Sequence, residues 1–161
     1  MIRPCLESDA AAVCEIYNHY IRDTVVTFEE TPLTVAEMAE RIAEIGTRFP
    51  WFVLEDGGVV IGYAYAATWK TRSAYRFAVE STIYLAPQST GRGLGLGLYA
   101  ALVAELRRRG FHSVIGGIAL PNGASIALHE KLGFKKLGSF TQVGWKCDRW
   151  VDVGYWELIL E

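Results

Sequence analysis

The chain has 161 residues, of which 51% are hydrophobic and 21% are charged, and its net charge is −2. This length and balance predict a single globular domain over residues 1–161, with a core that needs no metal or disulfide to stabilise it. Acidic and basic residues are interspersed, which argues against nucleic acid as a partner because phosphate binding needs a concentrated basic face.

The three cysteines, Cys5, Cys14 and Cys147, are far apart and odd in number, so they indicate neither a disulfide framework nor a metal site. The N-terminal residues lack the apolar core of a signal peptide. No apolar run approaches the ~18 residues that a membrane-spanning helix needs. We therefore expect a cytoplasmic protein with no metal and no membrane partner.

Two helices are predicted at the start of the chain. Ser8 or Asp9 can cap a helix that ends near residue 20. Thr34 and Glu37 have the spacing of a capping box, which predicts a second helix ending near residue 46.

Strands and helices alternate in the rest of the chain. Predicted strands cover residues 51–55, 59–69, 80–85, 113–120, 134–143 and 153–160, and the first two are joined by a hairpin turn at Asp56-Gly57-Gly58. Predicted helices run from a glycine-rich loop to about residue 109 and over residues 122–132. This order predicts an α+β fold with helices packed on a mixed sheet.

The glycine-rich loop reads Gly-Arg-Gly-Leu-Gly-Leu-Gly over residues 91–97, after a strand and at the start of a helix. Helix N-termini present free N–H groups that attract phosphate, and glycine lets the backbone approach a ligand closely. The spacing matches neither the Rossmann nor the Walker pattern. Glycines within a helix cost roughly 1 kcal/mol each, so we expect a compensating ligand there, most simply a pyrophosphate.

The segment from Ile83 to Gly95 resembles the acetyl-CoA-binding motif Q/R-x-x-G-x-G/A of the GNAT acetyltransferase superfamily. Thr90 takes the place of the usual Gln or Arg when Gly93 and Gly95 are the motif glycines. Gln88 begins the same pattern in an alternative register. We favour the first register because it places the leucines that follow correctly on the helix.

A second segment, Asn122 to Phe134, resembles the GNAT pattern N-x-x-S/A…Y-x-x-x-G-F, with His129 at the usual tyrosine position. Five further segments resemble phosphinothricin N-acetyltransferases and the related methionine sulfoximine acetyltransferases: 17–21, 69–72, 80–84, 120–122 and 150–156. They occur in order over nearly the whole chain. The resemblance implies the GNAT fold, a central, mostly antiparallel sheet flanked by about four helices, and a homodimer.

The resemblance also implies acetyl-CoA as co-substrate and a small amino-acid-like molecule as acceptor. Acetyl-CoA would pair with the backbone of Ile83, Tyr84 and Leu85, and Asn122 would contact its pantetheine arm. The expected pyrophosphate-binding residues are Gly91, Arg92, Gly93, Leu94, Gly95 and Leu96.

Two residues are candidates for proton transfer. An amine must lose a proton before it attacks a thioester directly, and the related acetyltransferases use the glutamate matching Glu80 as base. By its position alone, Glu80 would be a surface glutamate at the start of a strand. The resemblance implies that His129 protonates the leaving thiolate or assists Glu80, whereas a lone helical histidine is usually structural or solvated.

A substrate carrying carboxylate and phosphinate groups needs cations to bind it. Lys70, Arg72 and Arg76 lie between two predicted strands and could supply them; alternatively, they belong to a charged surface loop. Aromatic residues could supply an apolar wall, or simply pack. The predicted substrate-binding residues are Phe28, Lys70, Arg72, Tyr75, Arg76, Ser81 and Thr82.

Two other functions fit part of the pattern. The acceptor could be another small amine such as a polyamine, although the cationic loop would repel a polycation. The chain could also be a non-catalytic acetyl-CoA-binding module, although Glu80 argues against that.

Overall fold

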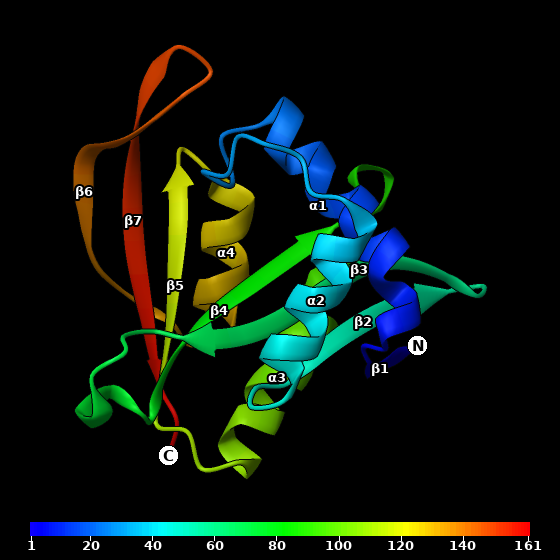
Figure 1. Ribbon diagram of the computed structural model, residues 1–161. Coiled ribbons are helices and arrows are strands. Elements are labelled where there is room, and N and C mark those ends of the chain that lie inside the picture. Colours follow the sequence, from blue (N-terminus) through cyan, green and yellow to red (C-terminus); the bar gives the residue numbers. More distant parts are fainter.

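A single seven-stranded sheet separates two layers of helices in the computed structural model, which describes residues 1–161 (Figure 1). The strands are β1 (Ile2–Pro4), β2 (Trp51–Asp56), β3 (Val59–Thr68), β4 (Ala78–Leu85), β5 (Ser113–Leu120), β6 (Lys135–Lys146) and β7 (Arg149–Ile159). Their order in the sheet is β1-β2-β3-β4-β5-β7-β6. Only β4 and β5 are parallel neighbours, so the prediction of a mixed, mostly antiparallel sheet is confirmed.

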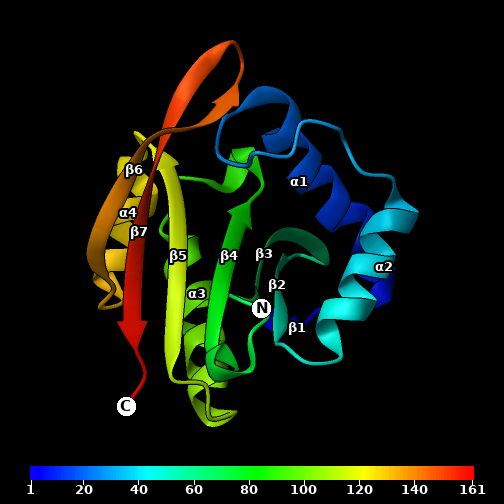
Figure 2. The same cartoon turned by 60° about the vertical axis from the view of Figure 1, so that its left-hand side comes forward.

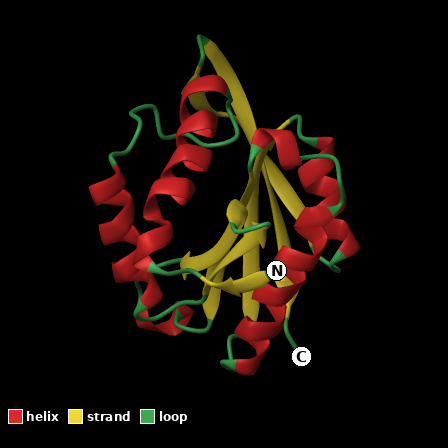
Figure 3. Cartoon of the chain, turned by 90° about the vertical axis from the view of Figure 1, so that its right-hand side faces the viewer, coloured by secondary structure: helices red, strands yellow, loops and turns green.

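Four α-helices cover the sheet, and the expected number is confirmed (Figures 2 and 3). They are α1 (Ala10–Asp23), α2 (Val35–Gly46), α3 (Leu94–Arg108) and α4 (Gly123–Lys131), with short 3₁₀ turns η1 (Glu7–Asp9), η2 (Ser73–Tyr75) and η3 (Pro87–Ser89). None of the helices is both long and apolar enough to span a membrane.

Each helical layer buries its own apolar core against the sheet. Leu98 and Leu102 of α3 are fully buried in a core that also receives side chains from α4. On the opposite face, Val13 of α1 and Ile42 of α2 are buried against β2 and β3. The central strands are therefore fixed on both sides, and their side chains alternate between the two layers, whereas β6 at the edge of the sheet is largely exposed.

The parallel pair β4 and β5 separates soon after it begins. The two strands are in register only from Ala78 opposite Ser113 to Glu80 opposite Ile115. Beyond that point β4 stays paired with β3 and β5 stays paired with β7, so each strand follows a different neighbour (Figure 1). The facing edges of β4 and β5 therefore lack a strand partner, and the sheet opens between them.

Several boundaries differ from the sequence-based expectation. The last two strands are longer than predicted because Cys147 and Asp148, both with positive φ (53° and 55°), make a two-residue turn that lets pairing continue almost to the tip. The first α-helix has Asp9 as its N-cap residue, as expected, but it ends at Asp23 instead of near residue 20. The Asp9 carboxylate accepts the N–H of Leu6 (2.8 Å) in η1 and makes no capping bond to α1. The edge strand β1 was not predicted.

Candidate active site

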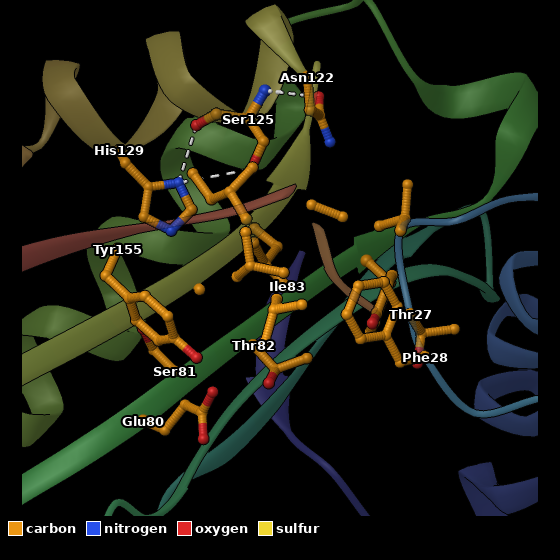
Figure 4. Close-up of a pocket in the computed structure, with 17 residues that line it drawn as sticks. Thr27, Phe28, Glu80, Ser81, Thr82, Ile83, Asn122, Ser125, His129 and Tyr155 are labelled. Carbon is orange, nitrogen blue, oxygen red and sulfur yellow. Dashed lines mark hydrogen bonds between the residues drawn. The ribbon is translucent and has the colours of Figure 1, made fainter. Parts of the chain in front are cut away.

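The opening between β4 and β5 contains a cavity of about 370 Å³ at the Glu80 end (Figure 4). Its walls come from the loop after α1, from β4 and β5, from α4 and from the β6–β7 hairpin. The lining residues are Val26, Thr27, Phe28, Glu80, Ser81, Thr82, Ile83, Tyr84, Gly117, Ile118, Ala119, Asn122, Ser125, His129, Val143, Val153 and Tyr155.

A second cavity, of about 470 Å³, lies at the glycine-rich loop and the start of α3. It shares the lining residues Val26, Ile83, Tyr84, Asn122 and Ser125 with the first cavity. The two cavities are therefore parts of one cleft, which runs from the start of α3 to Glu80.

The start of α3 offers a binding site for an anion. Gly93 is the N-cap residue in the left-handed conformation (φ 73°), and no side chain caps the helix. Gly91, Gly93 and Gly95 line the cavity, and Gly91 also has positive φ (72°). Glycine is needed where φ is positive, and the uncapped N–H groups and helix dipole favour a phosphate group there.

The Glu80 carboxyl group lies half-buried at the other end of the cleft, and no hydrogen bond within the chain holds it. Burial raises its pKa above the ordinary value, and the nearby Lys70 ammonium offsets part of that effect. A carboxylate with a raised pKa is a stronger base than an exposed one. The arrangement can therefore accept a proton from a group bound in the cavity.

His129 is buried between α4 and the sheet, and both of its ring nitrogens have partners. Nδ1 lies 2.7 Å from the carbonyl oxygen of Ser125, to which it can only donate (Figure 4). Nε2 is then an acceptor, and the Tyr99 hydroxyl donates to it at 3.0 Å. Burial lowers the pKa of His129, which favours this neutral form.

The Ser81 hydroxyl continues this buried chain of hydrogen bonds. With the Tyr99 proton engaged by His129, the Ser81 hydroxyl donates to the Tyr99 oxygen at 2.6 Å, and it lies 3.2 Å from the carbonyl oxygen of Ile115. The side chain of Ser81 thus links β4 to Tyr99 of α3 at the point where the ladder between β4 and β5 ends. Thr82 faces the opposite side of β4, as the alternation along a strand requires.

The structure brings most of the predicted site residues together. Eight of the predicted cofactor residues line the second cavity: Ile83, Tyr84, Leu85, Gly91, Gly93, Gly95, Leu96 and Asn122. Arg92 and Leu94 lie in the same loop but outside its lining. Around the first cavity lie Glu80, His129, Phe28, Ser81 and Thr82.

The other four predicted substrate residues belong to the connection between β3 and β4, outside the cavity lining. Arg72, Tyr75 and Arg76 are exposed, and the Arg76 guanidinium lies over the Phe77 ring at 4.6 Å. Lys70 is exposed too, with its ammonium 4.8 Å from the Trp69 ring centroid. Of the four, Lys70 is the one whose charge acts on Glu80.

Sequence reasoning missed several lining residues, above all Tyr155. Its ring packs edge-on against Trp69 and Phe140, and burial together with the Glu80 charge raises the pKa of its phenol. Tyr155 and Val153 are two residues apart on β7 and so share one face. That spacing is visible in the sequence, but which face meets Glu80 depends on the sheet order.

Comparison with known proteins adds to this geometry. Residues 2–154 match the model of the acetyltransferase (GNAT) domain family. The chain belongs to the GNAT acetyltransferase family. It is therefore an acyltransferase, as the sequence motifs predicted.

Relatives within the GNAT family are similar over nearly the full chain. A phosphinothricin N-acetyltransferase of Streptomyces viridochromogenes is 44% identical, over 99% of this chain and 87% of the relative. An L-methionine sulfoximine/L-methionine sulfone acetyltransferase of Salmonella typhimurium is 37% identical, over 99% of this chain and 94% of the relative. Among solved structures, a GNAT superfamily phosphinothricin acetyltransferase from Sinorhizobium meliloti in complex with AcCoA superimposes with a TM-score of 0.95 at 40% identity, covering 99% and 88% of the two chains.

Proposed function

We propose that the chain is an acetyl-CoA-dependent N-acetyltransferase that acetylates the α-amino group of a small amino-acid-like substrate such as phosphinothricin or methionine sulfoximine. The observation that carries the proposal is the single cleft that joins an anion-binding helix start to a half-buried carboxyl group. The names of the relatives support the same reaction and substrate class.

The second cavity offers the groups that acetyl-CoA would need. The uncapped start of α3, with Gly93 and Gly95, would hold the pyrophosphate. Beyond Glu80 the free edge of β4, from Ile83 to Leu85, would pair with the pantetheine amides, since β3 occupies only its other edge. Asn122, which caps α4 and lies where the two cavities join, would contact the pantetheine arm.

Glu80 is proposed as the general base for direct attack. The thioester supplies an activated acetyl group, and the Glu80 carboxylate takes a proton from the acceptor ammonium, directly or through water, so that the amine can attack. Phe28 and Thr82 would line the acceptor pocket. Lys70, placed near Glu80, is the predicted cation best located to meet an acidic group on the substrate.

We propose that His129 is a positioning residue rather than the acid that protonates the thiolate. To protonate the thiolate, His129 would have to break its hydrogen bond to Tyr99 or to Ser125, because both ring nitrogens are engaged. As a neutral acceptor, His129 instead ties α4 through Tyr99 to Ser81 of β4. It would thereby fix the width of the opening next to Glu80.

Release of free thiol from acetyl-CoA, measured with a panel of acceptors, tests the proposal. We expect turnover with phosphinothricin or methionine sulfoximine and little with spermidine. Turnover with spermidine alone would favour a polyamine acetyltransferase, and acetyl-CoA binding without turnover on any acceptor would favour a binding module.

We further propose a cytoplasmic homodimer. The β6–β7 hairpin carries five large apolar side chains that are more than half exposed, namely Leu137, Phe140, Val143, Trp145 and Trp150, and a second copy could cover them. The three free cysteines suit a reducing compartment. Sedimentation of the chain and of Trp150→Lys tests the dimer, which the lysine should weaken.

A further inference from the structure

Residues Val26–Phe28, called here the wall segment, line the Glu80 cavity without belonging to any helix or strand. They follow α1, and the Phe28 side chain is 41% exposed at the mouth of the cavity. Thr27 is only 8% exposed, and an irregular segment of this kind keeps one shape only where other elements hold it. The contacts of the wall segment therefore decide whether the cavity has a fixed shape.

Lys146, near the end of β6, holds the wall segment by its backbone. Its side chain is 4% exposed, and the ammonium donates to the carbonyl oxygen of Thr27 at 2.7 Å and to that of Tyr20 at 3.4 Å. It makes no ion pair, and its hydrogen bonds within the chain are to these two main-chain carbonyls. A buried ammonium is costly unless hydrogen bonds satisfy it, so these two bonds are strongly favoured.

Gly144, two residues earlier on the same strand, contacts the Phe28 side chain of the wall segment. A Cβ atom at this position would lie 2.3 Å from two carbons of the Phe28 ring. The ring therefore rests directly on the β6 backbone, in a space that only glycine leaves free. From the α1 side, the Tyr17 hydroxyl is hydrogen-bonded to the Thr27 hydroxyl at 2.9 Å.

We propose that Gly144 and Lys146 are positioning residues for the acceptor: through Phe28 and Thr27 they fix the wall segment and thereby set the affinity for the amino acid. The proposal rests on the proposed function, because it takes the Glu80 cavity as the acceptor site. Gly144 and Lys146 contact Phe28 and Thr27, which do not line the second cavity, and Val26 is the one residue of the wall segment that does, so acetyl-CoA binding should depend on them much less than acceptor binding.

A double-mutant cycle on Gly144 and Phe28 tests the contact. We expect Gly144→Ala to raise the KM for the amino acid on the order of tenfold, because displaced substrate-positioning groups cost affinity, while the KM for acetyl-CoA stays within about twofold. In a Phe28→Ala background the added methyl group meets no ring, so the same change should have little effect. Gly138→Ala is the matched control, since a Cβ there has nothing within 4 Å, and it should change neither constant.

Hydrogen exchange gives a readout that does not depend on turnover. In Lys146→Met and in Gly144→Ala, the Val26 amide, which donates to the Thr24 hydroxyl at 3.1 Å, should exchange at least about tenfold faster, while the amides of α3 keep their wild-type rates.

The results separate the two proposals. An equal effect of Gly144→Ala with and without the Phe28 ring, or unchanged exchange of the Val26 amide in both variants, would overturn the positioning role. If the wild-type chain acetylates no amino acid but exchange responds as expected, the proposed function fails while the anchoring of the wall segment stands.

Discussion

The two ends of the cleft are built in different ways. At the start of α3 the binding groups are backbone N–H groups of one continuous loop, shaped by glycines with positive φ. At the Glu80 end they are side chains from the loop after α1, from β4, β5, α4 and the β6–β7 hairpin. One end is local in the sequence, and the other is assembled by the fold.

This difference has a chemical consequence. A site made of backbone groups binds a common feature, such as a diphosphate, and is lost only when the backbone conformation changes. A site made of side chains can be altered one residue at a time. In the proposed function the acceptor could therefore change without disturbing the cofactor end, and variants at the two ends should affect different kinetic constants.

The largest expected effect is at Glu80. Glu80→Gln should lower kcat by roughly 100- to 1000-fold, because the proposed general base is lost, with acetyl-CoA affinity nearly unchanged. Steady-state kinetics and calorimetric titration with acetyl-CoA would measure both. A weakened affinity for acetyl-CoA with a normal kcat would contradict the assignment of Glu80 to the acceptor end of the cleft.

The pH dependence of kcat/KM also tests the proposed role of Glu80. Burial raises its folded pKa above the ordinary 4.5, so kcat/KM should fall with decreasing pH through an apparent pKa above that value. A raised carboxyl pKa also means that the folded state loses stability as pH rises through this window. Glu80→Gln should therefore be at least as stable to urea as the wild type at pH 7.5; a large loss would mean that the carboxylate is structural.

At the other end, Gly93→Ala should raise the KM for acetyl-CoA on the order of tenfold, since a side chain costs about 1–2 kcal/mol in the left-handed conformation that Gly93 adopts (φ 73°). Amino-acid KM at saturating acetyl-CoA should change little. Gly97→Ala is the control: it lies in α3, where a Cβ would meet only one side-chain atom, at 3.8 Å, and it should leave both constants unchanged. Equal effects of the two variants would argue against a conformational role for Gly93.

His129→Gln tests the boundary between the two ends. Because both ring nitrogens serve internal hydrogen bonds, kcat should fall by at most about tenfold, while the free energy of unfolding drops by about 1–2 kcal/mol. The folded pKa of His129 lies below the ordinary 6.5, so wild-type stability is lost as pH falls below that value, and the variant should lose less. A loss of kcat as large as that of Glu80→Gln would make His129 a proton-transfer group.

The smallest effect is expected away from both ends. The Thr34 hydroxyl accepts the N–H of Glu37 at 3.2 Å at the start of α2, far from the cavity lining. Thr34→Ala should cost about 1 kcal/mol of unfolding free energy and leave both Michaelis constants unchanged. A changed Michaelis constant would show that the stability of α2 affects substrate binding in the cleft.

The sequence predicted the features that depend on neighbouring residues. The capping box at Thr34, the strand at 113–120 and the glycine-rich helix start are each decided within a few residues, and each is present. The turn at Cys147 and Asp148 was missed because it contains neither Gly nor Asn, the residues that usually adopt positive φ in two-residue hairpins.

The acceptor end could be predicted only in part. Glu80 and His129 stood out through family motifs, but no site role was predicted for Tyr155 or Gly144, because their contacts depend on which strand lies next to which. The β3–β4 connection shows the converse. Its cations were conspicuous in the sequence, yet Arg72 and Arg76 lie outside the cavity lining. Long-range contacts of this kind are fixed by the sheet order, which local patterns do not contain.

The brief register of β4 with β5 has a mechanical consequence. Strand pairing joins the four-stranded half of the sheet, β1 to β4, to the half that contains β5, β7 and β6 at three residue pairs, Ala78–Glu80 with Ser113–Ile115. The two halves of the sheet are thus paired with each other only over this short stretch. A ligand that contacts both halves would connect them a second time, and its binding energy would then add to the unfolding free energy of the whole domain.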